Sequence, residues 1–154
     1  MAGKIVVGEY FKDLGRLFEE IQVTDNKGKT VDLAHALDEA IRMVEFLSGE
    51  NRKIMLIGNG GSAAIASHMA VDFWKNGGIR ATAFNDSSLL TCVGNDFGYP
   101  YTFSKPVEMF GDKGDLLIAI SSSGKSENIL NAVKAASEKN CTVITMSGFK
   151  SDNP

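Results

Sequence analysis

The stretch that most constrains the fold is Lys53-Ile-Met-Leu-Ile-Gly-Asn-Gly-Gly-Ser62. Its four consecutive apolar residues, 54–57, predict a strand buried on both faces, because a half-exposed strand would alternate apolar and polar residues. A glycine turn follows, and residues 62–74 then have helical character, with Ser62 as the expected N-cap. A strand, a glycine turn and a helix start direct backbone N–H groups and the positive end of a helix dipole at one spot. The sequence therefore predicts an anion site, with phosphate as the expected anion.

The rest of the chain alternates between apolar strands and longer helical or loop segments. The candidate strands are 53–58, 80–85, 115–121 and 142–147. This alternation predicts βαβ units, a parallel sheet and helices on both of its faces. Two amphipathic helices precede the first strand. We expect one domain over residues 1–154, with N-terminal helices within 4–49 and a parallel α/β core over 53–148.

Composition narrows the class of protein. The chain has 154 residues, of which 44% are hydrophobic, and this suffices for a substantial core. A net charge of −3 without a basic run argues against nucleic acid as a partner. No apolar run is long enough to span a bilayer, which argues against a membrane partner. Cys92 and Cys141 lack metal-type spacing, so we expect buried, reduced thiols in a cytoplasmic protein.

A second polar loop, Ser121-Ser-Ser-Gly-Lys-Ser126, follows the third predicted strand. This loop and the glycine turn both lie at carboxyl ends of strands, where ligands bind in a doubly wound sheet. The loop offers hydroxyl groups and the N-terminus of the helix that follows, and both suit a phosphate monoester. The hydroxyls belong to Ser121, Ser122, Ser123 and Ser126. Together the two loops predict one site for a small phosphorylated molecule.

Two nucleotide-binding interpretations stay open. Residues 58–63 fit the dinucleotide fingerprint G-x-G-x-x-A, and Asp86 lies roughly where its acidic residue belongs. Gly124-Lys-Ser126 matches the end of a P-loop, although Ala119 stands at the position of its first glycine. A nucleotide-binding protein is therefore an alternative of a different class.

Four motifs in order make the chain resemble the sugar isomerase (SIS) domain family. They are Gly-Asn-Gly-Gly-Ser62, His68-Met-Ala-Val-Asp72, Val93-Gly-Asn-Asp-Phe-Gly98 and Ile120-Ser-Ser-Ser-Gly-Lys-Ser126. The branch they resemble most is phosphoheptose (sedoheptulose 7-phosphate) isomerase. The resemblance implies a three-layer αβα fold with a flavodoxin-like parallel sheet, and a homotetramer. It also implies an intramolecular oxidoreductase that converts sedoheptulose 7-phosphate into D-glycero-D-manno-heptose 7-phosphate.

The resemblance further implies roles for particular residues. In bacterial members His68 and Asp72 would bind zinc, and Asp72 would also touch the sugar. Isomerisation moves a proton between adjacent carbons, and Asp72 is a candidate for the acid or base, although the family usually has glutamate there. The residues expected to bind substrate, with the serines of the second loop holding its phosphate, are Asn59, Gly60, Gly61, Ser62, Asn95, Asp96, Ser121, Ser122, Ser123 and Ser126.

The family's last helix carries a glutamine and a histidine that complete the metal site and supply a catalytic acid/base. That helix would follow Pro154 and is not in this chain. Because zinc normally takes three or four protein ligands, we expect the zinc site of this chain to be incomplete. The alternative interpretation is a non-catalytic SIS module that binds a phosphosugar or another protein.

Overall fold

The computed structural model describes residues 6–149, so residues 4 and 5 of the predicted helical region lie outside the described residues. The chain divides into two compact units, Met1–Met43 and Val44–Pro154. None of the helices between residues 6 and 149 combines the length and apolar character needed to cross a membrane.

The first unit holds one element that the sequence did not reveal. Helix α1 (Val7–Glu19) and the start of α2 (Leu33–Gly49) were predicted, but a two-stranded antiparallel hairpin lies between them, made of β1 (Val23–Thr24) and β2 (Thr30–Val31). Its turn is the polar stretch that follows Thr24. There the Asp25 carboxylate accepts hydrogen bonds from the amides of Lys27 and Lys29, both at 2.9 Å. This side chain closes the turn locally.

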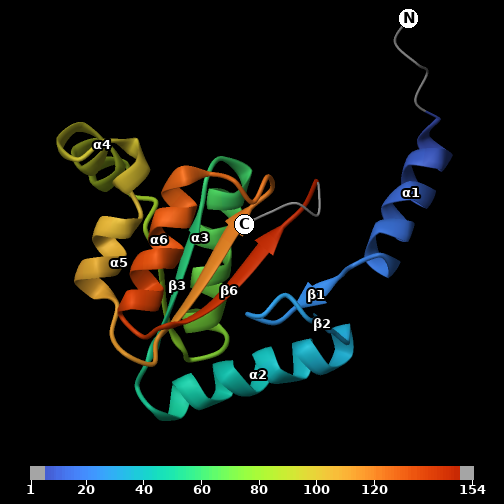
Figure 1. Cartoon of the computed structure of the whole chain (residues 1–154), viewed down its shortest axis with the longest axis horizontal. Coiled ribbons are helices and arrows are strands. Elements are labelled where there is room, and N and C mark those ends of the chain that lie inside the picture. The colour runs from blue at the N-terminus through green and yellow to red at the C-terminus, as the bar shows by residue number, and fades with distance from the viewer. Residues whose placement is uncertain (1–5, 150–154) are drawn as a thin grey trace, which may run out of the picture. The chain divides into compact units, whose positions relative to one another are not determined.

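The second unit is built on a four-stranded parallel sheet of order β4-β3-β5-β6 (Figure 1). In order along the chain its strands are β3 (Lys53–Gly58), β4 (Arg80–Ala83), β5 (Leu116–Ser121) and β6 (Thr142–Ser147). The strand order is second, first, third, fourth, as in flavodoxin-like sheets. This confirms the predicted fold class and the existence of all four strands. Strand β4 is shorter than predicted, ending at Ala83.

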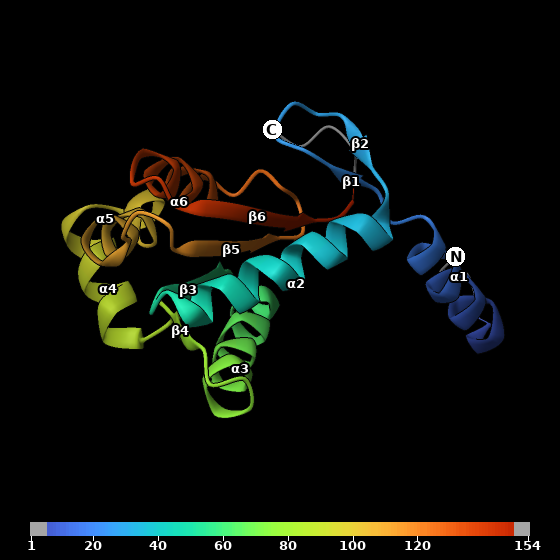
Figure 2. The ribbon, with the colours of Figure 1, turned by 90° about the horizontal axis from the view of Figure 1, so that it is seen from below.

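Helices cover both faces of this sheet, as Figure 2 shows from below. They are α3 (Gly61–Lys75), α4 (Ser87–Asp96), α5 (Ser104–Phe110), α6 (Glu127–Glu138) and the 3-10 turn η1 (Tyr99–Tyr101). Helix α5 follows η1 after a break of two residues, 102 and 103. Pro100 and Pro106 each lie in the first turn of their helix, where a missing backbone N–H costs nothing.

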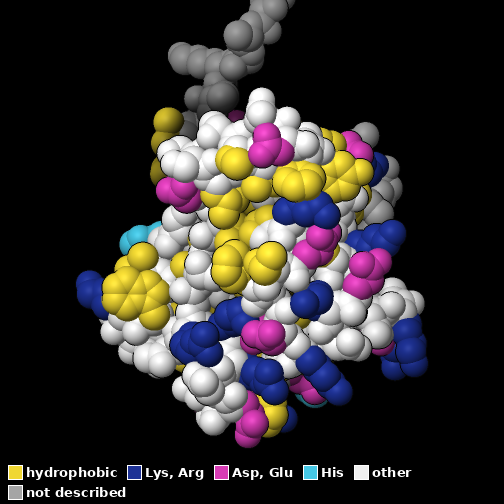
Figure 3. All heavy atoms as spheres, turned by 90° about the vertical axis from the view of Figure 1, so that its left-hand side faces the viewer, with side chains coloured by type: hydrophobic (Ala, Val, Ile, Leu, Met, Phe, Trp, Pro, Cys, Tyr) yellow, Lys and Arg dark blue, Asp and Glu magenta, His cyan; other side chains and the backbone are white. Residues whose placement is uncertain are grey.

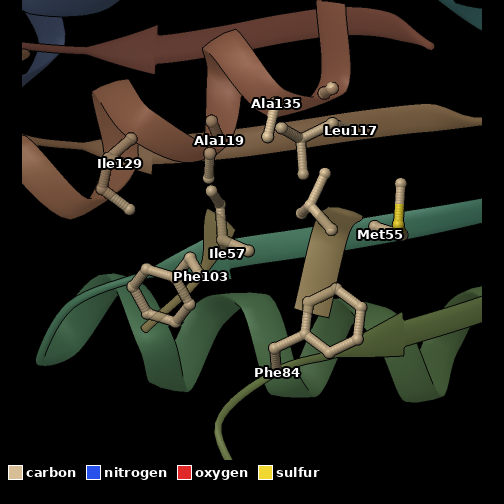
Figure 4. Packing of buried hydrophobic residues seen from close by; sticks show 11 residues of the cluster. Met55, Ile57, Phe84, Phe103, Leu117, Ala119, Ile129 and Ala135 are labelled. Atoms are coloured by element: carbon tan, nitrogen blue, oxygen red, sulfur yellow. The ribbon is translucent and has the colours of Figure 1, made fainter. Parts of the chain in front are cut away.

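Alternating residues of the central strands face two separate hydrophobic clusters. Met55 and Ile57 pack on the same face as Leu117 and Ala119, against Phe103 and residues of α5 and α6 (Figure 4). On the opposite face Ile54 and Leu56 join Leu116 and Ile118, and pack against Ala66 and Ala70 of α3 and Leu47. Both faces are apolar, which explains the unbroken hydrophobic runs in β3 and β5. The polar residues are left for the strand ends.

The amino ends of β3 and β5 are joined by a buried carboxylate. The Asp115 side chain is 1% exposed and accepts hydrogen bonds from the amides of Lys53 (3.0 Å) and Asp112 (2.8 Å). The Lys53 ammonium pairs with Asp115 and, at 2.7 Å, with Asp112. Burial disfavours the charged lysine, but the hydrogen bonds to the two carboxylates outweigh it and raise the pKa of Lys53. This network fixes the register of the two strands at the end opposite the glycine turn.

We expect Asp115→Ala to lower the free energy of unfolding by about 3 kcal/mol, because it leaves two amides without their acceptor and removes one of the two carboxylates that pair with Lys53. Asp112→Ala is the matched control. Its side chain is 70% exposed, so its loss should cost clearly less than the loss of Asp115. Urea denaturation of both variants measures the difference. Equal losses would show that Asp115 does not anchor the strands.

Candidate functional site

The turn after β3 can only be made with glycine. A Cβ atom on Gly58 would lie 2.7 Å from backbone and side-chain atoms of Ser62, and Gly60 has a φ of +55°. Helix α3 begins at Gly61, with Gly60 as its N-cap, so the prediction that Ser62 caps the helix is wrong. The Ser62 amide instead donates to the Asn59 carbonyl at 3.0 Å. The chain thus reverses within three residues and brings Ser62 against the strand end.

Two backbone donors remain at this turn. Among the residues that the structure describes, none accepts a hydrogen bond from the amide of Gly60 or of Gly61. Both amides lie at the start of α3, where the helix dipole is positive. The turn therefore keeps the donors that the anion-site prediction requires.

The serine loop after β5 is closed by its own hydrogen bonds. The Gly124 amide donates to the Ser121 carbonyl at 2.9 Å, and Gly124 has a φ of +67°. Ser126 is the N-cap of α6 but makes no side-chain cap hydrogen bond; its hydroxyl lies 3.2 Å from that of Ser121. The hydroxyls at the two ends of the loop thus face each other, and helix capping does not account for Ser126.

The two loops line one pocket of about 190 Å³. It lies beside the carboxyl ends of β3 and β5, whose register pairs Gly58 with Ile120. It holds six of the predicted substrate-binding residues: Asn59, Ser62, Ser121, Ser122, Ser123 and Ser126. Its size is below the roughly 300 Å³ at which pockets enclose a drug-sized molecule, so it suits one end of a small polar ligand.

Two apolar residues of this pocket were not predicted. Ile120 ends the apolar run of β5, and Phe149 follows β6. The amide of Gly148 donates to the Ser122 carbonyl at 3.0 Å, which ties the end of β6 to the serine loop. Phe149 could have been predicted from its position just past the carboxyl end of a strand, since residues at such positions reach the same edge of a parallel sheet.

A buried amide network supports the Asn59 side chain. Its amide exchanges two hydrogen bonds of 2.9 Å with the amide of Asn128, which is 3% exposed. The Tyr99 hydroxyl donates to the Asn59 Oδ1 at 2.9 Å. Neither partner was singled out from the sequence. Both lie at least 40 residues away along the chain, so no local pattern could have found them.

The predicted zinc ligands lie apart from this pocket's lining. His68 and Asp72 occupy one face of α3, with Nε2 and Oδ2 3.4 Å apart and side chains 77% and 39% exposed. The other Asp72 oxygen accepts from Asn76 at 3.1 Å. Between residues 6 and 149 there is no group of three or more metal-ligating side chains that could hold an ion. His68 and Asp72 therefore do not form a zinc site with the described residues alone.

Asn95 and Asp96 are exposed at the end of α4 and are not among the pocket's lining residues. The Asn95 side-chain amide donates to the Asp96 carboxylate at 2.8 Å.

The Cys92 thiol hydrogen-bonds to the Asp96 carboxylate, which raises the pKa of Cys92. Cys92 is exposed, so the expectation that both cysteines are buried is wrong. Its raised pKa nevertheless favours the neutral thiol over a reactive thiolate.

Asp86, the acidic residue of the dinucleotide interpretation, has a structural role. It is the N-cap of α4, and one of its carboxylate oxygens accepts from the amides of Ser88 and Leu89 at 2.9 and 3.0 Å. A carboxylate bound in this way stabilises the helix start. This capping role accounts for Asp86 without requiring that its carboxylate bind a ribose hydroxyl.

The comparisons with known proteins agree with this architecture. The sequence model of the SIS domain matches residues 9–148, and the chain belongs to this family. It is 40% identical over 140 residues to a phosphoheptose isomerase from Nitratidesulfovibrio vulgaris, which covers 87% of this chain and 64% of the relative. Over 126 residues it is 40% identical to a phosphoheptose isomerase from Campylobacter concisus, covering 77% and 66%. The chain thus spans about two thirds of the length of these curated relatives.

Solved structures show the same fold. A phosphoheptose isomerase from Neisseria gonorrhoeae superposes with a TM-score of 0.81 at 35% identity, over 95% of this chain and 75% of that one. One from Francisella tularensis also gives 0.81, at 30% identity, over 96% and 74%. These likenesses confirm the SIS fold.

The turn geometry predicts opposite effects on stability when two of its glycines are replaced by alanine. Gly58→Ala should lower the free energy of unfolding by about 2 kcal/mol, because its methyl group would collide with Ser62. Gly61→Ala meets nothing within 4 Å and should be neutral or slightly stabilising, since alanine favours a helix over glycine. Thermal or urea unfolding of the pair distinguishes the two. A stable Gly58→Ala variant would contradict the close approach.

Proposed function

We propose that this chain is a phosphosugar isomerase that binds sedoheptulose 7-phosphate and converts it into D-glycero-D-manno-heptose 7-phosphate. The observation that carries the proposal is the pocket in which the glycine turn and the serine loop meet. Hydroxyl and amide donors at the carboxyl ends of parallel strands suit the phosphate and hydroxyl groups of such a ligand. The relatives named phosphoheptose isomerase support the same substrate class.

In this proposal the serine loop binds the phosphate, through Ser121, Ser122, Ser123 and Ser126. Asn59, Gly60, Gly61 and Ser62 of the turn contact the sugar, as do Asn95 and Asp96. An aldose–ketose isomerisation needs a base and an acid that transfer a proton between adjacent carbons. Asp72 is the proposed group for one of these steps.

One observation favours the non-catalytic alternative. The pocket's lining consists of asparagine, serine, isoleucine and phenylalanine, and neither His68 nor Asp72 belongs to it. A pocket without an acid or a base can bind a phosphosugar without changing it. Turnover of sedoheptulose 7-phosphate by this chain would refute the alternative.

For a metal, His68 and Asp72 remain the proposed zinc ligands. Imidazole nitrogen and carboxylate oxygen are ligands that zinc accepts, and the two side chains share a helix face. The site needs at least one more ligand than residues 6–149 supply.

We also propose a cytoplasmic location. Both cysteines are free in the structure, and Cys92 is exposed. An exposed free thiol persists most readily in a reducing compartment.

A homo-oligomer, with four copies as the proposed number, would explain the apolar surfaces. Helix α1 buries none of its residues, and exposed side chains such as Phe11, Leu14 and Phe18 follow one another at three- and four-residue steps. A 13-residue helix is marginal in water unless its apolar face is covered. Figure 3 shows hydrophobic side chains gathered on the face formed by α4 and α5. Phe97, the C-cap residue of α4, is exposed.

Sedoheptulose 7-phosphate at about one hundred times its Kd should stabilise the chain by about 2.7 kcal/mol, which raises Tm by roughly 5–10 °C. NADH and ATP should not raise the Tm. Ser121→Ala and Ser123→Ala should each weaken binding about tenfold, because each removes a hydroxyl that contacts the phosphate. Differential scanning fluorimetry measures both effects, and repeating it with zinc chloride and with EDTA tests the proposed metal.

Ser137→Ala is the matched control for the serine variants. Its hydroxyl donates to the Val133 carbonyl on α6 and lies outside the pocket. Stabilisation by NADH or ATP in place of the sugar phosphate would overturn the proposed function. Unchanged binding in Ser121→Ala and Ser123→Ala would overturn the role of the serine loop.

Replacing Phe11 and Phe18 together with lysine should shift the chain to a smaller species, since charges on the apolar face of α1 cannot be buried between copies. Analytical ultracentrifugation measures the mass. Lys12→Ala on the same helix should leave the mass unchanged. A monomeric wild-type chain at micromolar concentration would contradict the proposed oligomer.

A further inference from the structure

The amide pair of Asn59 and Asn128 spans the two loops of the pocket. Asn59 is the first residue after β3, and Asn128 is the second residue of α6, just after the serine loop. Each side chain donates one N–H to the other's oxygen at 2.9 Å. Asn59 lines the pocket whereas Asn128 is buried behind it. The Asn128 side chain therefore acts on a ligand through Asn59.

The direction of these hydrogen bonds is fixed by a third residue. The Thr102 hydroxyl donates its single proton to the Tyr99 carbonyl at 2.9 Å, so towards Asn128 it can only accept. The Asn128 Nδ2 lies 3.3 Å from that hydroxyl. Asn128 must therefore turn its NH₂ group towards Thr102 and Asn59. This orientation in turn requires Asn59 to present its oxygen to the Asn128 NH₂ group.

The hydrogen bonds of the Asn59 side chain leave one of its N–H groups unused. Its Oδ1 accepts from Asn128 and from the Tyr99 hydroxyl, which uses both lone pairs. One N–H of its Nδ2 donates to Asn128. Among the described residues, the second N–H has no acceptor. Asn59 therefore offers a ligand one N–H donor and no acceptor.

We propose that Asn128 is a positioning residue that holds Asn59 as an N–H donor towards an oxygen of the bound sugar. This inference rests on the proposed function. In an aldose–ketose isomerisation the carbonyl oxygen gains negative charge, and an oriented N–H donor stabilises that charge without having to reorganise. The phosphate is held separately by the serine loop. Asn128 thus governs the sugar end of the ligand and leaves the phosphate end unaffected.

The test compares sedoheptulose 7-phosphate with inorganic phosphate by isothermal titration. Asn128→Asp keeps the shape of the side chain but loses both N–H donors, so Asn59 is no longer held in one orientation. We expect Kd for the sugar phosphate to rise about tenfold, as for the loss of one hydrogen bond, and Kd for phosphate to change by less than twofold. Asn131→Asp, on the same helix and outside the pocket, should change neither.

A second variant protects the test against misfolding of Asn128→Asp. Tyr99→Phe removes one partner of the Asn59 oxygen from an exposed ring, and should weaken sugar-phosphate binding in the same selective way, by about threefold. If sugar phosphate binds to both variants as to the wild type, the positioning role is overturned and the proposed function stands. Equal losses for both ligands would also overturn it, because they indicate general scaffolding. A wild-type chain that binds phosphate but not the sugar phosphate refutes the proposed function and this role with it.

Discussion

The parallel pairing of β3 with β5 is the constraint on which the site depends. In this register Gly58 lies opposite Ile120, so the next residues along each strand, Asn59 and Ser121, reach the same edge of the sheet. The buried Asp115 network holds the other end of both strands. Because the two ends are fixed, the glycine turn and the serine loop must meet, and their meeting creates the pocket.

The amide pair adds what backbone pairing cannot supply. Two loops that share an edge can still move independently, whereas the Asn59–Asn128 exchange joins them through two hydrogen bonds at a mostly buried position. Removing one partner would leave buried polar atoms unsatisfied, which makes the arrangement costly to break. The close approach of Gly58 to Ser62 keeps the turn tight at the end of β3. Backbone shape and side-chain chemistry therefore specify the same conformation.

The strands, the fold class and the two loops could be predicted because their signs are local. Apolar runs such as 54–57 and glycine or serine clusters at their ends are visible in any window of ten residues. The hairpin around Asp25 was missed because its strands have only two residues each. Asn128 and Tyr99 were missed because their roles arise from contacts across 69 and 40 residues. Sequence pattern predicts where a site lies more readily than what supports it.

The distribution of charge around the pocket separates binding from chemistry. The described lining residues carry hydroxyl, amide and apolar groups and no side chain that gains or loses a proton near neutral pH. Such a lining suits an anionic ligand, because neutral donors can contact it without the cost of burying a lone cation. Proton transfer needs a titratable group, and the carboxylate proposed for it, Asp72, lies on α3, whose first turn borders the pocket. In the proposed function, recognition therefore belongs to the loops at the sheet edge, and catalysis would be supplied by groups outside that lining.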